Sequence, residues 1–400
     1  MARALESAEV NPIRSAIRLR AERAIVTGDA NALAALLRDH EGILREAGVA
    51  VTDARAFIAG AHHFDTWDAF DAFRREAARQ DSATAAFEAS VEAVIDGDVA
   101  ELERRLADRP ELIEARSARR HRATLLIYVG ANGVEDFRQR TPPNAVHVAR
   151  TLLTRGADVN AVATMYGGST TLGLVATSVH PERAGVQRAL IDLLIANGAT
   201  FDSAVAPDYT HGLIINACLA NGRGDAAVFL AERGARVDLE GACGIGRPDV
   251  VRQLVDAAGL PLSAATERQL RAGFNWACEY GRRDVVELLL RLPIDLKTIH
   301  HGETGLHWAA LHAHVSIVRT LLDAGFGVDV KDERWGSTPL GWAIHGWSER
   351  QPDLPADAYY ETVMAIRSAG AEVRQAWISD DRVLADSRML AALTSARRDR

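Results

Sequence analysis

Cysteine and proline are both scarce in this sequence. Of its 400 residues, only 3 are cysteine and 12 are proline. The cysteines, Cys218, Cys243 and Cys278, form neither a CxxC pair nor an even set for disulfides, which is typical of a reducing compartment. A chain with so little proline, 48% hydrophobic residues and 25% charged residues is not a low-complexity tail. The composition therefore predicts an ordered protein that buries a sizeable core.

The sequence also lacks a basic excess and a long apolar run. Lys and Arg number 46 against 54 Asp and Glu, which gives a net charge of -8, and no long Lys/Arg run is present. Such a surface does not neutralise a row of phosphates, so we expect no nucleic-acid partner. The first residues show no apolar core of a secretory signal, and residues 213–220 are far shorter than a membrane span. We therefore expect a cytoplasmic protein without a membrane partner.

Common catalytic signatures are missing as well. The sequence contains no HExxH pattern, no GxSxG pattern and no GxxxxGK followed by Ser or Thr. Residues 241–246, Gly-Ala-Cys-Gly-Ile-Gly, resemble a phosphate loop only in composition, because no buried strand precedes them and no Lys-Ser or Lys-Thr pair follows. We predict no cofactor, and an enzyme is not the favoured interpretation.

A repeated pattern is what the sequence does contain. Residues 277–286 align with residues 309–318, and each segment has two small residues, a polar break and then an apolar run. The period is about 32 residues. The repeats continue into an apolar pair and a Gly-containing turn, as at residues 152–160, 193–199 and 321–325. Glycine at that place suits the left-handed end of a helix.

This pattern predicts a short helix, a tight turn and a second amphipathic helix in every repeat. Small pairs such as Ala309-Ala310 let the first helix lie close to its neighbour, while the Leu-rich second helix supplies most of the buried area. One such repeat cannot bury its apolar face alone, so neighbouring repeats must stack. The predicted fold is all-α, an α-solenoid of stacked helix-turn-helix repeats with a helical N-terminal cap.

The openings of two repeats resemble those of the ankyrin repeat family. Residues 304–307, Thr-Gly-Leu-His, and residues 338–341, Thr-Pro-Leu-Gly, match the family's Thr-Pro-Leu-His, and His314 matches its Gly-His turn. The resemblance covers roughly three quarters of the chain, because degraded repeats recur. They begin near Ala85, Thr124, Thr170, His211, Val237 and Ala272. The sequence also resembles a group of bacterial ankyrin proteins with long insertions, and this resemblance implies no activity.

The repeats divide the sequence into three predicted parts. They are a helical cap with a divergent repeat-like segment at residues 1–80, an ankyrin solenoid at 81–376, and a C-terminal cap with a frayed tail at 377–400. Caps are expected because an open end of a stack exposes apolar surface. Insertions interrupt the solenoid near residues 134–144, 178–185 and 347–357. These insertions either build a ligand rim or are tolerated surface loops.

One position recurs just after the opening tetrapeptide of each repeat. In an ankyrin stack it lies on the short helix that faces the concave surface, and three successive repeats carry Trp276, Trp308 and Trp342 there. A partly exposed tryptophan row is a good recognition surface, because it offers large rigid area at small entropic cost. The alternative is that the indoles fill seams between helices. Residues about one turn further along extend the predicted face: Glu279, Tyr280, His312 and His345.

A second, more polar compartment is predicted nearer the N-terminus. Its residues come from the repeats that begin near Thr124 and Thr170 and from their insertions: Tyr128, Asn132, Arg138, Arg140, Tyr166 and His180. Arg138 and Arg140 can hold a carboxylate or phosphate of a ligand. The alternative is that both arginines are simply solvated.

The cysteines and the clustered histidines have structural explanations. Cys243 and Cys278 occupy the second small-residue position of their repeats, so we expect them to replace alanine in the packing seam. His307 and His312 point about 140° apart on a helix, which disfavours a shared metal. His307 and His314 match ankyrin positions that orient the turn and connect neighbouring repeats. We predict no metal site.

Two functions remain open at this point. The favoured one is a binding scaffold that recognises a protein or peptide through its concave helix face and its insertion loops. The alternative is a small-molecule-binding protein or an enzyme with an aromatic pocket in the concave groove. Its acid or base would be His312, His345, His180 or Glu279.

Overall fold

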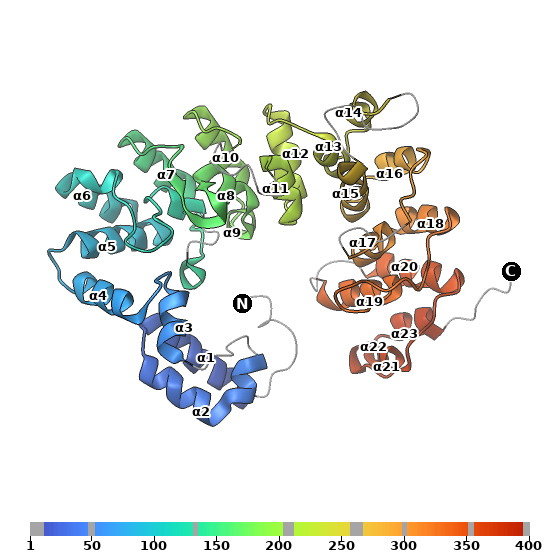
Figure 1. Cartoon of the computed structure of the whole chain (residues 1–400), viewed down its shortest axis with the longest axis horizontal. Coiled ribbons are helices and arrows are strands. Elements are labelled where there is room, and N and C mark those ends of the chain that lie inside the picture. Colours follow the sequence, from blue (N-terminus) through green and yellow to red (C-terminus); the bar gives the residue numbers. More distant parts are fainter. Residues whose placement is uncertain are drawn as a thin grey trace. The chain divides into compact units, whose positions relative to one another are not determined.

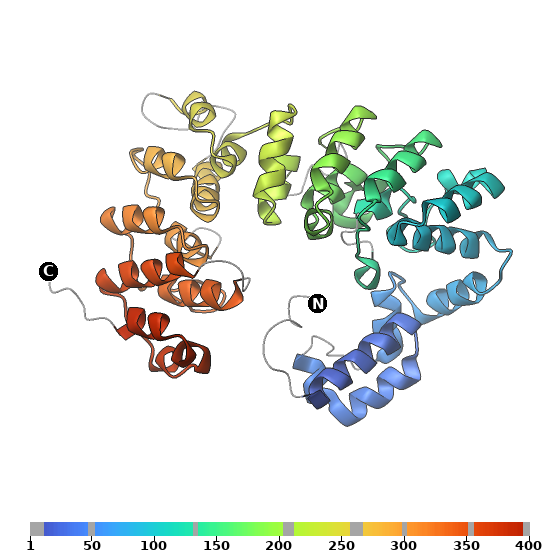
Figure 2. The ribbon, with the colours of Figure 1, turned by 180° about the vertical axis from the view of Figure 1, so that it is seen from behind.

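The structure, a computed structural model, describes residues 12–46, 53–130, 135–202, 212–256, 267–297, 302–350 and 356–394. These residues are mostly helical, which confirms the predicted all-α class (Figures 1 and 2). The chain divides into two compact units, Met1–Ala235 and Arg236–Arg400. The three-part division into caps and solenoid is a different partition, and it stays a prediction.

The first unit begins with four helices around one apolar core. They are α1 (Pro12–Thr27), α2 (Ala30–Glu46), α3 (Ala54–Ala61) and α4 (Trp67–Ala77). Asp53 and Thr66 begin α3 and α4, because their side-chain oxygens accept backbone N–H groups of the first turn. The rings of Phe64 and Trp67 lie 5.7 and 5.6 Å from that of Phe70. These three rings pack together where α3 is followed by α4.

The rest of the first unit consists of short helices and one two-stranded ribbon. Its elements are α5 (Ala83–Asp96), α6 (Val99–Asp108), η2 (Pro110–Ile113), η3 (Ile127–Gly130), η4 (Asp136–Arg138), α7 (Ala145–Thr154), β1 (Val162–Ala163), η5 (Met165–Gly167), β2 (Ser169–Thr170), α8 (Thr171–Thr177), α9 (Val179–Arg183), α10 (Gln187–Ala196), α11 (Ile214–Ala220) and α12 (Gly224–Glu232). β1 pairs antiparallel with β2, Val162 opposite Thr170. Consecutive pairs such as α5 with α6 and α11 with α12 pack together.

Two elements of this unit differ from the sequence prediction. An α-helix is predicted after Thr124, but the structure has only the 3₁₀ helix η3. Gly130, the last residue of η3, lies close to α8, since a Cβ at Gly130 would lie 2.6 Å from the Cβ of Leu174. The predicted insertion at residues 178–185 is not a loop but contains α9. Ser178 begins this helix by accepting a hydrogen bond from the backbone N–H of His180.

The second unit is a stack of helix pairs. Its helices are α13 (Leu239–Ile245), α14 (Pro248–Gln253), α15 (Glu267–Glu279), α16 (Arg283–Leu289), α17 (Gly305–Leu311), α18 (Val315–Asp323), α19 (Pro339–Glu349), α20 (Asp357–Ser368), α21 (Gln375–Ile378), α22 (Asp381–Ala385) and α23 (Ser387–Thr394). The first helices of the pairs, α13, α15, α17 and α19, pack in sequence, and so do the second helices, α14, α16, α18 and α20. We call the former the first-helix row.

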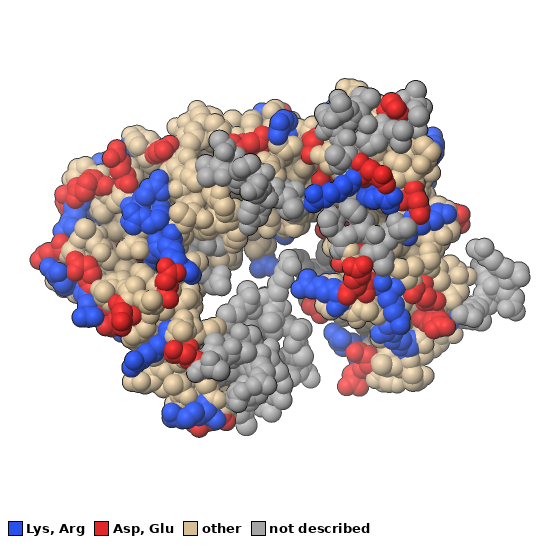
Figure 3. All heavy atoms as spheres, viewed as in Figure 1, with Lys and Arg blue, Asp and Glu red and all other residues tan. Residues whose placement is uncertain are grey.

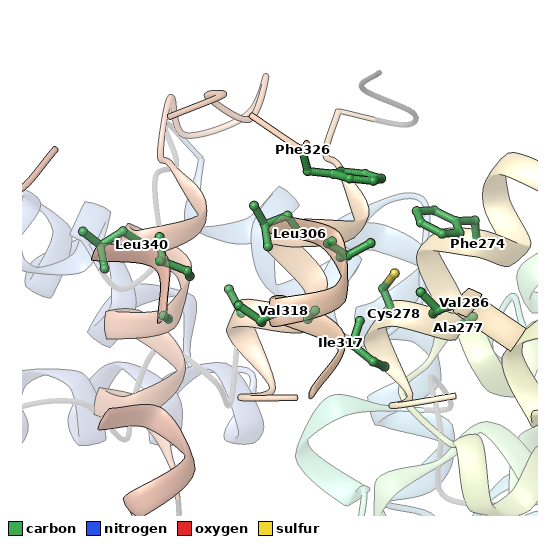
Figure 4. Packing of buried hydrophobic residues seen from close by; sticks show 14 of the residues in the cluster. Phe274, Ala277, Cys278, Val286, Leu306, Ile317, Val318, Phe326 and Leu340 are labelled. Atoms are coloured by element: carbon green, nitrogen blue, oxygen red, sulfur yellow. The ribbon is translucent and has the colours of Figure 1, made fainter. Parts of the chain in front are cut away.

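Small residues let the first helices approach one another. Cys243 on α13 lies against Gly273 on α15, where a Cβ on the glycine would be 2.8 Å from the cysteine Cβ. Cys278 on α15 meets Gly305 on α17 in the same way. Figure 4 shows Cys278 in one packed layer with Phe274 and neighbouring apolar side chains. The prediction that Cys243 and Cys278 replace alanine in the seam is therefore confirmed, since both are completely buried.

The end of the second unit differs from the prediction at its insertion. A polar loop is predicted at residues 347–357, but α19 continues through Glu349 because Trp347 is buried in the core. Residues 351–355 lie outside the described part of the chain. Helices α21 to α23 follow α20, and Val383 and Met389 join the same apolar core. These helices cover apolar surface at this end of the unit.

Charges of both signs are mixed over the surface. On the face shown in Figure 3, Lys and Arg alternate with Asp and Glu over the described residues of either unit. Helices of the described part are all too short or too polar to cross a bilayer.

Candidate functional site

The predicted tryptophan row lies on three successive first helices. Trp276, Trp308 and Trp342 come from α15, α17 and α19, and each of these helices packs on the next. Trp276 and Trp308 are half-buried, so their indoles keep solvent-accessible surface. Trp342 is only 6% exposed and fills a seam, which agrees for this indole with the alternative interpretation of the row.

Trp342 is buried because other rings cover it. Its ring centroid lies 5.1 Å from that of Trp308, in an edge-on arrangement that favours aromatic contact. On another side it meets Trp335 at 5.7 Å. Trp335 is 61% exposed, and the sequence argument missed it because it lies in the turn before the Thr338 opening rather than at the recurring position. The row therefore ends in an aromatic cluster of Trp308, Trp342 and Trp335.

Asp332 holds this cluster in place. Its Oδ2 accepts hydrogen bonds from the indole N–H of Trp342 at 3.0 Å and from the backbone N–H of Ser337 at 2.9 Å. Its Oδ1 accepts the backbone N–H groups of Arg334 and Trp335. Burial raises the pKa of Asp332, but these hydrogen bonds outweigh burial and hold the pKa below its usual range. The exposed Trp335 is thus presented by a fixed turn.

The predicted polar residues beside the row are spread over its three helices. Glu279 and Tyr280 are half-buried at the end of α15, whereas His345 on α19 is exposed. His312 follows α17, is exposed, and stacks on His314 at 6.0 Å between ring centroids. The pKa of His312 is lowered, mainly because its ring is packed against the protein and to a smaller extent by the charge of His314.

Three carboxyl groups along the row have raised pKa values. The pKa of Glu279 is raised to about 8, mainly by burial and to a smaller extent by the charge of Glu303. Burial and the charges of Asp332 and Glu333 raise that of Glu303 to about 7, against the opposing charge of Arg334. Burial and Asp238 raise that of Glu240, on α13, to about 7. Only Glu279 was a predicted site residue, since Glu240 and Glu303 match no motif.

His307 and His314 have the structural roles predicted for them. His307 Nδ1 accepts the backbone N–H of Thr304 at 3.2 Å and lies 2.9 Å from its hydroxyl, which fixes the start of α17. Its Nε2 reaches the carbonyl of Ser337 in the next repeat. His314 Nε2 donates to the carbonyl of Glu279 at 2.8 Å and so connects two repeats. Both predictions are confirmed.

The polar compartment predicted in the first unit exists, but its side chains point at one another. Tyr128 is buried, and its hydroxyl donates to Glu135 Oε1 at 2.9 Å, so it is not on an exposed helix face. Arg138 pairs with Glu88 at 2.8 Å and with Glu92 at 2.7 Å. Arg140 pairs with Asp96 at 2.6 Å and with Glu92. The anions closest to the two arginines are therefore side chains of α5 rather than those of a ligand.

Glu135 is the centre of this compartment, and the sequence argument missed it. Its Oε1 lies 2.7 Å from Arg119 Nε and 3.0 Å from His121 Nε2. Burial raises the pKa of Glu135, but the hydrogen bond with His121 and the charges of Arg119 and Arg138 outweigh it and bring the pKa to about 2. The available signal was the basic stretch at residues 116–122, directly before the Thr124 repeat.

The other predicted members of the compartment lie apart from Glu135. Tyr166 is 52% exposed in η5. His180 is half-buried, and its Nε2 lies 3.2 Å from Gln139 Oε1 in the insertion. Burial and the charge of Arg183 lower the pKa of His180. Asn132 lies outside the described residues.

A cleft of about 440 Å³ opens beside this compartment. Phe70, Phe73 and Phe137 line it together with Arg138 and Arg140. Its volume is in the range of small-ligand sites, but the arginines at its wall are already paired with carboxylates of the chain.

Metal ligation has no support among the described residues. They contain no group of three or more His, Cys, Asp or Glu side chains placed to hold an ion. Cys218, Cys243 and Cys278 are free and buried, and burial raises the pKa of each thiol. A thiol kept protonated in the core is a poor nucleophile and a poor ligand.

Known proteins share parts of this chain. The family model described as ankyrin repeats (3 copies) matches residues 274–351. Inversin of Danio rerio is 45% identical over 65 residues, which are 16% of this chain and 6% of inversin, so the chain spans only a small part of that relative. The human ASB11 ankyrin repeat domain is similar in crystal structure, with a TM-score of 0.36 and 18% identity over 71% of this chain and 99% of that chain.

The family match falls within the stack of helix pairs of the second unit. Residues 274–351 include the C-terminal part of α15 and all of α16 to α19. The same residues carry the aromatic cluster and the two histidines that connect repeats. The matched residues 274–351 of this chain are therefore ankyrin repeats.

Proposed function

We propose that this chain is a scaffold that binds a protein or peptide partner through the first-helix row of its second unit. Ankyrin repeats are in general protein-interaction modules, and we assign the first-helix row to the concave helix face that the sequence predicts. A stack of this kind offers an extended surface rather than a single pocket, which suits a macromolecular partner.

The observation that carries the proposal is the exposure of Trp335. A tryptophan with 61% of its surface in solvent is costly unless something covers it, and here the turn that bears it is fixed by Asp332. Rigid, exposed indoles that lie beside half-buried ones are typical of the residues that contribute most binding energy. The ring of Trp335 contacts that of Trp342, and the ring of Trp342 in turn contacts that of Trp308.

The alternative of an enzyme or small-molecule binder finds less support. It needs a deep pocket beside His312 or His345, and both histidines are exposed. Clefts of about 350 to 440 Å³ do occur, but residues between Val26 and Arg140 form their walls. We therefore propose the scaffold alone.

The proposal is tested by selecting peptides on the intact protein. A random dodecapeptide phage library is panned against the full chain, and the affinities of enriched peptides are measured by fluorescence anisotropy. Trp335→Ala is expected to weaken binding by about tenfold or more, as for a central aromatic contact. Met364→Ala is the control, because Met364 is also exposed but lies on α20 in the second-helix row. Equal affinity for Trp335→Ala and the wild type would remove this face from the proposal.

We also propose a cytoplasmic location, because Cys218, Cys243 and Cys278 are free, buried thiols. Alkylation of thiols in intact cells, followed by mass spectrometry of the denatured protein, is expected to show all three reduced. An oxidised pair would contradict this location.

A further inference from the structure

A second surface, in the first unit, is lined by arginines. Two clefts, of about 350 and 440 Å³, share Thr27 and Arg74 in their walls and therefore adjoin one another. We call the two clefts together the arginine groove. Its walls come from helices α1 to α5 and from the segment that contains η4. All of these elements belong to the first unit, whereas the first-helix row belongs to the second.

Arg55 and Arg74 both line the smaller cleft, and both are exposed, so a partner can reach them. Among the residues that the structure describes, no Asp or Glu side chain forms an ion pair with either guanidinium. Asp29 lies in the same wall, but its Oδ1 accepts the backbone N–H of Ala32 at 2.9 Å. The other arginines of the larger cleft are already paired with carboxylates of α5. Two positive charges of the groove are thus left uncompensated by the described residues, although the net charge of the chain is -8.

Contacts with the chain position both guanidiniums. Arg55 Cζ lies 5.5 Å from the ring centroid of Trp67, and Arg74 Cζ lies 5.7 Å from that of Phe70. Arg74 Nη1 also donates to the carbonyl of Gly28 at 3.1 Å. Gly28 has a φ of 70°, and a Cβ there would lie 2.9 Å from the Phe70 ring and 3.3 Å from Arg74 Nη1. A guanidinium that is held in this way loses less entropy when it binds an anion.

An aromatic wall lies beside these charges. Phe70, Phe73 and Phe137 line the larger cleft. The ring of His62 connects two of them, because its centroid lies 4.5 Å from that of Phe70 and 4.7 Å from that of Phe137. His62 is neutral near pH 7, since its pKa is lowered to about 4, mainly by burial. The groove therefore combines positioned positive charges in one cleft with apolar surface in the next.

We propose that the arginine groove binds an acidic segment of a protein partner, in which two carboxylates adjoin an apolar side chain. The carboxylates pair with Arg55 and Arg74 in the smaller cleft, and the apolar side chain enters the larger cleft beside Phe73 and Phe137. Arginine suits this role because its planar guanidinium donates two parallel hydrogen bonds to one carboxylate. Arginine clusters are a general means of recognising acidic motifs. A protein segment fits better than a lone anion, because only a segment fills both clefts.

The test selects peptides on the full chain with Trp335→Ala, which removes the main aromatic contact proposed for the first-helix row. A random dodecapeptide phage library is panned against this variant at low ionic strength, and affinities are measured by fluorescence anisotropy. Enriched peptides are expected to contain two Asp or Glu residues beside an apolar one. Replacement of the acidic residues by Asn or Gln is expected to reduce affinity by about tenfold or more. Affinity should also fall as NaCl is added, because exposed charges are screened.

Variants of the groove test the two arginines directly. Arg55→Gln and Arg74→Gln are each expected to weaken peptide binding by about tenfold. Arg75→Gln is the control, because Arg75 is exposed on the same helix, α4, and pairs with Asp71 instead. Thermal unfolding checks that each variant keeps the fold. If Arg74→Gln unfolds because its contact with Gly28 is lost, Arg55→Gln decides the test, since the Arg55 side chain makes no hydrogen bond to the described residues.

The outcomes separate this inference from the proposed function. In the chain labelled with 5-fluorotryptophan, a peptide bound in the arginine groove is expected to shift the resonance of Trp67, which contacts Arg55, and not that of Trp308. Unchanged affinity with Arg55→Gln and Arg74→Gln, or the absence of acidic peptides from the selection, would overturn the inference and leave the first-helix row as proposed. Peptides that inorganic phosphate displaces, and that bind equally well with Ser in place of the apolar residue, would assign the charges to a small anion and also overturn it.

Loss of the first-helix proposal would in turn leave this inference in place.

Discussion

The carboxylate of Asp332 and the indole of Trp342 are joined by a hydrogen bond of 3.0 Å, although the two residues come from different elements. Asp332 lies in the turn before the Thr338 repeat, and Trp342 lies inside α19. The bond ties the exposed part of the aromatic cluster to its buried part. The cluster is therefore a rigid surface, which lowers the entropic cost of binding a partner.

Replacement of Asp332 is expected to release this turn. Asp332→Ala removes the acceptor of four hydrogen bonds and leaves the buried indole N–H of Trp342 unpaired, so the free energy of unfolding should fall by about 2 to 4 kcal/mol. Urea unfolding measures the change. Asp323→Asn, at an exposed position at the end of α18, serves as the control and should alter stability by less than about 0.5 kcal/mol.

The same residue predicts a pH dependence. The pKa of Asp332 is lower in the folded chain than in the unfolded chain, so its charge stabilises the fold above the unfolded pKa. That contribution is lost as the pH falls through the folded pKa. The stability difference between wild type and Asp332→Asn should thus be constant above about pH 5 and shrink in more acidic solution. A difference that grows on acidification would show that the carboxylate is not held in its charged form.

Trp335 and Trp342 should respond in opposite ways to truncation. Trp342 is buried, so Trp342→Ala leaves a cavity and is expected to cost about 3 to 5 kcal/mol of unfolding free energy. Trp335 is mostly exposed, so Trp335→Ala should cost less than about 1 kcal/mol and remove the emission of a solvent-exposed indole. Thermal unfolding and fluorescence spectra distinguish the two. Comparable destabilisation by both would mean that Trp335 is a packing residue.

The close approach of α15 and α17 predicts a coupled pair of mutations. A Cβ on Gly305 would lie 2.8 Å from Cys278 Sγ, so Gly305→Ala should destabilise the protein by about 1 to 3 kcal/mol. Cys278→Ala removes that sulfur and should recover part of the loss in the double variant. A double-mutant cycle measures the coupling. Recovery will be incomplete, because Phe274 Cε1 is equally close to the added Cβ.

The sequence predicts the stack of helix pairs well, because the stack depends on periodic spacing. Leu306, Val318 and Leu340 recur with the repeat and are buried accordingly. The positions that it missed belong to turns, where spacing varies. Trp335 lies in a turn that hydrogen bonds to Asp332 hold in place, and no periodic pattern encodes those contacts.

Ion pairs between residues far apart in the chain, as in the polar compartment of the first unit, could not be predicted from the sequence. We expected Arg138 and Arg140 to contact a ligand or solvent. In the structure both form ion pairs with carboxylates of α5, and the positions of these carboxylates depend on the fold. Glu88 and Glu92 are about 50 residues earlier in the chain, so only the fold brings them to these arginines. Likewise, the basic stretch at residues 116–122 indicates a need for carboxylates but does not single out Glu135 as the centre of a buried network.

That network makes Glu135 a strong stability determinant. Glu135→Gln removes the charge that faces Arg119 and Arg138, and it is expected to cost about 3 to 5 kcal/mol because buried cations lose their partner. The folded pKa of about 2 lies below the unfolded value, so the contribution is present above about pH 4.5 and is lost as the pH falls toward 2. Urea unfolding at neutral and acidic pH tests both points. Glu111→Gln, at an exposed position in η2, should leave stability nearly unchanged.

Fluorine NMR tests the central claim most directly, because it observes each indole on the intact chain. The protein is labelled with 5-fluorotryptophan, and its 7 tryptophan resonances are assigned by single Trp→Phe variants. A selected peptide that binds is expected to shift the resonances of Trp335 and Trp308 and to leave that of Trp67, on α4, in place. Saturable peptide binding that moves neither Trp335 nor Trp308 would contradict recognition through the first-helix row.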